Sequence, residues 1–177
     1  MIPFIASTSA YRFSTPGVFP GLERIGGKER VRSRIAGGER LSVPVAGGAS
    51  ALKRGGDLQI SQHGRWQDVH LGALRAVYGR TPWFIHLFPE IERIYNCFSE
   101  GRMADFTGEL HKLVLHWIGD EATLNAAMEM HCNEPERFEA IASELSKGID
   151  PELSVLDALF RLGPDVIFLL INTEDPA

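Results

Sequence analysis

Three arginines alternate with smaller residues between positions 30 and 34. Arg30, Arg32 and Arg34 are separated by Val31 and Ser33, and alternate residues of a β-strand lie on one face. Three guanidinium groups along about 14 Å of strand could hold a phosphate or a carboxylate through paired hydrogen bonds. The spacing therefore predicts an anion-binding or substrate-binding site. The alternative is a solvated strand face, or an edge strand whose charges oppose aggregation.

His70 is the histidine whose position best suits chemistry. It follows Trp66 by one turn on the apolar face of a predicted helix, where neighbouring groups could set its pKa for a role as general base. The alternative is a structural histidine that is hydrogen-bonded through one ring nitrogen. Trp66 and Tyr78, with Trp83 and Phe84, could stack on a sugar ring, although aromatic residues at helical spacing more often belong to the core.

Metal and nucleophile chemistry have no matching spacing in this chain. It contains no H-E-x-x-H and no G-x-S-x-G motif. His111 and His116 are five positions apart and do not share a helix face. Cys132 directly follows His131, but adjacent side chains diverge on a helix, and Cys97 has no activating base beside it in the sequence. We therefore predict no metal site and no cofactor.

The candidate arginines lie in a segment that is typical of a small sheet. Up to about residue 62, Gly-Gly pairs at 26, 37, 47 and 55 mark turns, because glycine accepts positive φ. Between the turns lie the predicted strands Pro3–Ser7, Arg30–Ile35, Leu41–Val45 and Leu58–Ser61. The second and third of these strands should form a β-hairpin around residues 36–39.

From residue 65 onward, the apolar residues recur at the period of a helix. Trp66–Tyr78 is the clearest case, with Gly79 to end it. The next predicted helix is Pro89–Phe98, with Pro89 at its first position. The other predicted helices are Phe106–Ile118, Pro135–Leu145, Leu153–Leu162 and 166–170. Ser154 and Asp157 form an S-x-x-D capping box ahead of an apolar run.

These elements predict an α+β fold in a single domain over residues 1–177. A small mixed or antiparallel sheet from residues 2–62 should be covered by helices from residues 65–171, with the helix Trp66–Tyr78 packed near the strand Arg30–Ile35.

The composition indicates a cytoplasmic globular protein. Of the 177 residues, 44% are hydrophobic and the net charge is -5, which does not suit a nucleic-acid partner. Two cysteines form no disulfide framework. Residues 1–6 do not look like a signal peptide, and the longest apolar run, Val166–Ile171, is too short to span a membrane. The composition does not indicate an oligomeric state.

Four stretches carry a resemblance to the WbqC-like protein family. They are Arg30–Ile35 with Leu41–Val45; Trp66 and His70 with Tyr78, Pro82 and Phe84; Glu90–Tyr95 with Asp105 and Phe106; and Leu153–Phe160 with Leu162, Gly163 and Pro164. Together they cover roughly residues 30–118 and 153–170, and the last is similar to the ending of the Bacteroidetes branch. The chain departs from the family pattern at residues 12–29, which are too few and too rich in glycine for the usual helix and acidic strand, and at Val31, where the family has asparagine.

The resemblance implies a role in O-antigen or capsule synthesis. It leaves two classes of function open. The first is a transferase, with acyl or glycyl transfer onto a sugar as the suggested reaction and a phosphorylated or nucleotide-linked sugar, or an activated amino acid, as the partner. The second is a non-catalytic binding or scaffold protein for polysaccharide-synthesis enzymes. The shortened N-terminal region favours the second class, and the clustered arginines favour the first.

Overall fold

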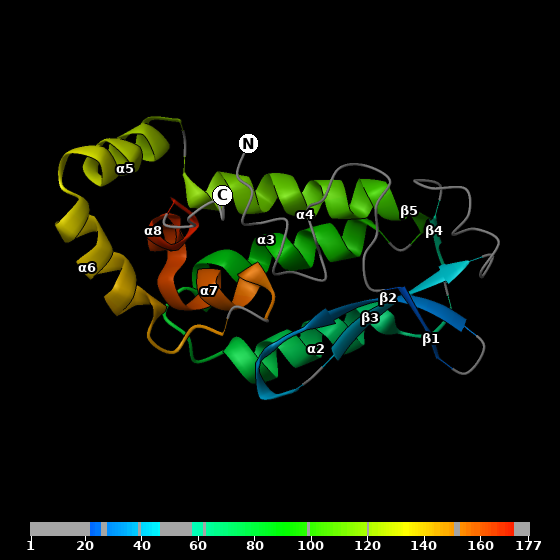
Figure 1. Cartoon of the computed structure of the whole chain (residues 1–177). Helices are drawn as coiled ribbons and strands as arrows, with labels where there is room; N and C mark the ends of the chain where they lie inside the picture. Colours follow the sequence, from blue (N-terminus) through cyan, green and yellow to red (C-terminus); the bar gives the residue numbers. More distant parts are fainter. Residues whose placement is uncertain are drawn as a thin grey trace.

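The fold is α+β, as the sequence predicted. The computed structural model describes residues 22–25, 28–38, 40–46, 58–61, 63–98, 100–119, 121–150 and 153–171 (Figure 1). Its sheet has the strand order β1 (Leu22–Ile25), β2 (Lys28–Arg34), β3 (Arg40–Ala46), β4 (Gln59–Ile60) and β5 (Gly101–Arg102). Every neighbouring pair of these strands is antiparallel.

The predicted hairpin is present, formed by β2 and β3. A short 3-10 turn, η2 (Ala36–Gly38), closes it, and Gly37 has φ of 79°, a conformation that suits glycine. In β3, Leu41, Val43 and Val45 are buried, which places one face of the sheet against the core. The strand β1 was not predicted, and the predicted strand at residues 3–7 lies outside the described residues.

Most predicted helices form close to their expected bounds. The helix α2 (Trp66–Tyr78) ends at Gly79 and packs against β3. It is followed along the chain by α4 (Met103–Ile118), α6 (Pro135–Ser146) and α7 (Val155–Leu162), and the chain then passes through the 3-10 turn η3 (Gly163–Val166) into α8 (Ile167–Ile171). In Figure 1, α5 and α6 lie at the end of the molecule away from β4 and β5.

Two helical predictions require correction. The helix α3 (Phe84–Cys97) begins before Pro89, which lies inside it rather than at its first position. The backbone bond that Pro89 cannot make would go to the carbonyl of Ile85, a residue whose side chain is 71% exposed, so water can reach this turn. The helix α5 (Glu121–Asn133) was not predicted at all. Its apolar residues do not gather on one face, and Ala127 is its core residue.

One hydrophobic core joins the sheet to the helices. It contains β3 and β4 residues, the inner faces of α2, α3 and α4, and most of α7. Aromatic side chains dominate its largest fully buried positions, among them Tyr78, Tyr95, Phe106 and Phe160. The candidate histidine and aromatics all lie on elements that face this core.

Candidate functional site

The register of β2 against β3 decides which residues accompany the arginines. The directly opposed pairs are Arg30 with Pro44, Arg32 with Ser42, and Arg34 with Arg40. Residues that oppose one another across antiparallel strands lie on the same face. The alternate pairs, Val31 with Val43 and Ser33 with Leu41, occupy the other face, where Val43 and Leu41 are buried. The arginine positions are therefore on the sheet face opposite to these core residues.

His70 lies in the core, on the inner side of α2. Its side chain is 2% exposed, and Nδ1 is 3.2 Å from the hydroxyl of Tyr95. The ring also meets Trp66 edge-on, with centroids 5.3 Å apart. These contacts hold the ring in one orientation. They fit the alternative of a structural histidine that is hydrogen-bonded through one ring nitrogen. Proton exchange with a substrate would require access that 2% exposure does not provide.

Trp66 completes an aromatic cluster with His70, Tyr95 and Phe106. Its ring centroid is 5.6 Å from those of both Tyr95 and Phe106, and its side chain is buried. Within the described part of the chain, its indole Nε1 is buried without a hydrogen-bond partner. An aromatic ring enclosed on this scale packs the core rather than offering a face to a sugar.

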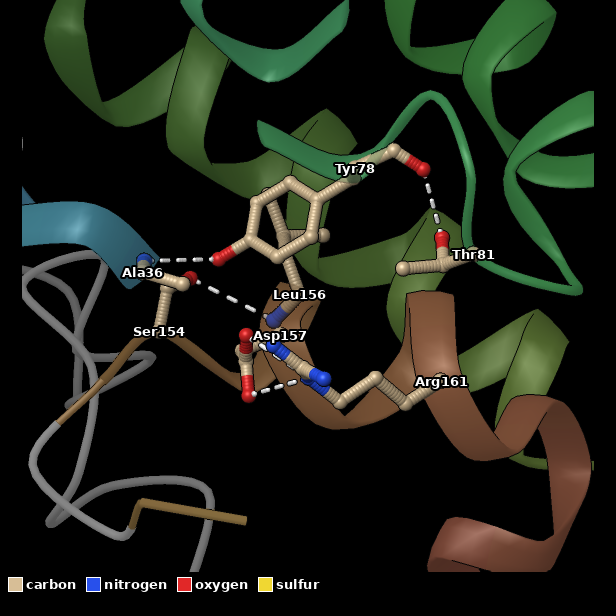
Figure 2. A network of polar contacts seen from close by, with 7 residues as sticks. All are labelled: Ala36, Tyr78, Thr81, Ser154, Leu156, Asp157 and Arg161. Atoms are coloured by element: carbon tan, nitrogen blue, oxygen red, sulfur yellow. Dashed lines mark hydrogen bonds and ion pairs between the residues drawn. The ribbon is translucent and has the colours of Figure 1, made fainter. Parts of the chain in front are cut away.

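Tyr78 ties α2 to the arginine hairpin. Its hydroxyl accepts a hydrogen bond of 3.0 Å from the backbone N–H of Ala36, the residue that opens η2 (Figure 2). Its ring stacks on Phe160 of α7, with centroids 4.9 Å apart. Burial raises the pKa of Tyr78 far above its ordinary value; the Ala36 N–H opposes this rise and the Asp157 carboxylate adds to it. The hydroxyl therefore stays protonated.

Asp157 and Arg161 form the charged part of this network. Both carboxylate oxygens of Asp157 are 3.1 Å from Nε of Arg161, one turn later on α7 (Figure 2). The Asp157 side chain is 2% exposed and that of Arg161 is 40% exposed. The arginine thus neutralises a buried carboxylate from its half-exposed position.

The sequence predicted that Ser154 and Asp157 form a capping box, and the structure shows the Ser154 part of it. Ser154 is the N-cap of α7, and its hydroxyl accepts a hydrogen bond from the N–H of Leu156. The side chain of Asp157 instead faces Arg161 and influences Tyr78. The spacing of Asp157 and Arg161 at i and i+4 was the sequence signal for this pair.

The structure brings some of the predicted site residues together and separates others. Trp66 and His70 touch in the core, and Tyr78 reaches the hairpin that carries Arg30, Arg32 and Arg34 through Ala36.

Among the described residues, no group of three or more histidine, cysteine or acidic side chains is placed to hold a metal ion. None of the helices in the described ranges combines the length and apolarity that crossing a bilayer requires.

Comparison with known proteins yields one match. The model of the WbqC-like protein family matches residues 25–148, a range that begins in β1 and ends after α6. No curated protein and no solved structure gives a significant match to the chain. The matched range contains the arginine strand, His70 and Tyr78, whereas Asp157 and Arg161 follow it.

Proposed function

Because the chain belongs to the WbqC-like protein family, we propose that it acts in the synthesis of a bacterial surface polysaccharide, O-antigen or capsule, as a transferase that modifies a sugar. Its partner in this proposal is a phosphorylated or nucleotide-linked sugar, or an activated amino acid. The family match shows membership alone. The proposed role is supported by that membership together with the anion-binding chemistry of the arginine strand.

The register of β2 is the observation that carries the proposal. Arg30, Arg32 and Arg34 occupy the sheet face opposite to the buried residues of β3, together with Ser42. Guanidinium groups bind phosphate and carboxylate oxygens in pairs. Three arginines on one strand of a chain whose net charge is -5 form a local cationic segment, to which an anionic donor could bind. Trp66 and Tyr78 would contribute by fixing the elements beneath the site, since both are buried.

The first experiment tests anion binding by thermal unfolding. A ligand that binds only the folded chain stabilises it by about 2.7 kcal/mol at a hundredfold excess over Kd. We expect millimolar phosphate or sugar nucleotide to raise the melting temperature by roughly a few degrees, because the shift produced by a given stabilisation depends on the length of the chain. Arg32→Ala should abolish this rise, whereas Arg65→Ala, which removes an exposed arginine at the start of α2, should retain it. The absence of any shift in the wild type would refute the anion site.

A second candidate function is a non-catalytic binding or scaffold protein for polysaccharide-synthesis enzymes. The burial of His70 and its contact with Tyr95 favour it, because a transferase that used His70 as its general base would need the substrate to reach that ring. The two functions differ in what His70→Gln should do. In a transferase, complementation of a strain that lacks the gene should fail although the variant still binds the anion. In a scaffold, the folded variant should restore the polysaccharide profile on a gel.

A further inference from the structure

The guanidinium of Arg161 contacts its carboxylate partner through a single nitrogen. Its Nε is 3.1 Å from Oδ1 and 3.1 Å from Oδ2 of Asp157 (Figure 2), whereas paired arginines and carboxylates frequently form two parallel hydrogen bonds from two nitrogens. Within the described ranges, Arg161 forms no other hydrogen bond or ion pair. The N–H groups on its two Nη atoms therefore remain available to a further acceptor.

The carboxylate that holds Arg161 is buried, unlike those of the other ion pairs. The Asp157 side chain is 2% exposed, whereas the carboxylate side chains in the remaining pairs of the described residues are between 38% and 73% exposed. Asp157 lies within Val155–Phe160, in which every residue is buried. A fixed carboxylate orients the guanidinium before a ligand arrives, so binding costs less conformational entropy.

The exposure and the charge of this pair indicate which ligand suits it. The Arg161 side chain is 40% exposed, so a solute can reach it. The pair carries no net charge, and the nearby Tyr78 hydroxyl stays protonated because burial raises its pKa. A ligand with one negative charge would leave one charge unbalanced, and a dianion would leave two. A carboxylate is singly charged, and its two oxygens match the planar fork of a guanidinium.

We propose that the Nη groups of Arg161 bind a carboxylate group, and that Asp157 is the positioning residue that orients the guanidinium for it. Two small-molecule sources share this chemistry: a sugar acid and a free amino acid. The choice of these sources rests on the proposed function, in which a sugar is modified. The site itself is separate from the arginines of β2, and it follows the residues 25–148 that the family model matches.

The test is an NMR titration in which the Nε–H signal of Arg161 reports on the guanidinium directly. The signal is assigned by its absence from the spectrum of Arg161→Lys. The probes are glucuronate, glycine and glucose, the last being a neutral match for the first, at about 0.15 M salt, where weak contacts at exposed charges are screened. We expect a carboxylate probe to shift the signal saturably at millimolar concentration and glucose to leave it in place. Tighter binding of glucuronate assigns the site to a sugar acid, and tighter binding of glycine assigns it to an amino acid.

Arg161→Lys separates a binding role from a structural one. The ammonium still balances Asp157, so the unliganded melting temperature should stay close to that of the wild type, but it lacks the planar fork. Carboxylate binding, followed through backbone amide signals, should weaken about tenfold or more. Asp157→Asn keeps the positive charge without its anchor and should weaken binding about threefold or more. Arg137→Gln, which removes an arginine paired with the exposed Glu134 on α6, should leave the affinity unchanged.

Several results would overturn this inference. They are the absence of a saturable shift with either carboxylate, an equal shift with glucose, equal binding by Arg161→Lys and the wild type, and tighter binding of the dianion glucose 1-phosphate than of either carboxylate. The proposed function is tested separately, by phosphate and Arg32→Ala. If that test succeeds while Arg161 binds no carboxylate, the proposed function survives alone. If Arg161 binds a carboxylate while no phosphate or sugar nucleotide stabilises the wild type, the Arg161 site survives alone.

Discussion

The hydroxyl of Tyr78 accepts a hydrogen bond from the backbone N–H of Ala36, 42 positions earlier in the chain, at 3.0 Å. This contact joins the last turn of α2 to the loop between the two strands that carry the arginines. The same ring stacks on Phe160 of α7, so one side chain connects the hairpin, the helix beneath it and a helix near the C-terminal end.

Replacing Tyr78 with phenylalanine should lower stability and loosen the hairpin. The change keeps the ring but leaves the Ala36 N–H without its acceptor, which should reduce the free energy of unfolding by about 1–3 kcal/mol in urea denaturation. Phosphate affinity should fall as well, because the loop between Arg34 and Arg40 is less well held. Tyr95→Phe is the matched control: it removes the contact with His70 and should leave phosphate affinity unchanged. Equal affinities in the two variants would contradict the positioning role.

Arg161→Gln should destabilise the protein more than the loss of an exposed ion pair does. It leaves the buried carboxylate of Asp157 without its guanidinium partner. We expect a loss of about 2 kcal/mol in urea unfolding, below the 3–5 kcal/mol of a fully buried pair because Arg161 is 40% exposed. The double variant Asp157→Asn with Arg161→Gln should regain part of this loss. Arg65→Gln, at an exposed pair with Asp68, should show no measurable change.

Gly163→Ala should be poorly tolerated at the junction of α7 and η3. Gly163 has φ of 59°, and a Cβ there would fall 2.3 Å from Cε2 of Trp83. Strain from positive φ and the collision with the indole together predict a loss of at least about 2 kcal/mol. Gly148→Ala also places a side chain at positive φ, 86°, but with no atom within 4 Å of the added Cβ, so it should cost less. Equal losses in the two variants, compared by urea unfolding, would show that the Trp83 contact is readily relaxed.

His111 should make stability depend on pH in the weakly acidic range. Burial lowers the pKa of His111 below its ordinary value of 6.5. The unfolded chain therefore takes up the proton first as the pH falls, and this contribution to stability, complete above pH 6.5, is lost as the pH falls through the folded pKa. The difference in unfolding free energy between about pH 7.5 and about pH 5.5 should be smaller in His111→Gln than in the wild type. His63→Gln, at an exposed residue, should keep the wild-type difference.

Local patterns predicted the elements that carry the candidate site. The alternation of residues 30–35 and 41–45, with Gly37 between them, gave the hairpin, and the helical period of residues 66–78 gave α2 with its end at Gly79. The two misjudged helices lack such signals: Pro89 suggested a helix start that the chain makes earlier, and α5 has no concentrated apolar face.

The register and the buried network are beyond local patterns. The sequence placed Arg40 near Arg34, but only the strand register sets the two positions directly opposite one another. Asp157 lies 79 positions after Tyr78 (157 − 78), and no local pattern links the two residues. Spacing along the chain predicted the Ser154 cap, because capping is settled within one turn. It could not reveal that His70 is 2% exposed, because burial depends on which elements pack above that helix.

The position of α7 has a practical consequence for anyone who works with a shortened form of this protein. The family match ends at residue 148, yet Leu159 and Phe160 are fully buried in the shared core. A gene fragment trimmed to the matched residues would encode a product that lacks the core residues of α7. Tyr78 would then lose the ring of Phe160 that packs on it. Such a product should be recovered largely in inclusion bodies. For recombinant expression, the minimal fragment needs to continue through α8, where Ile167 is still buried in the core.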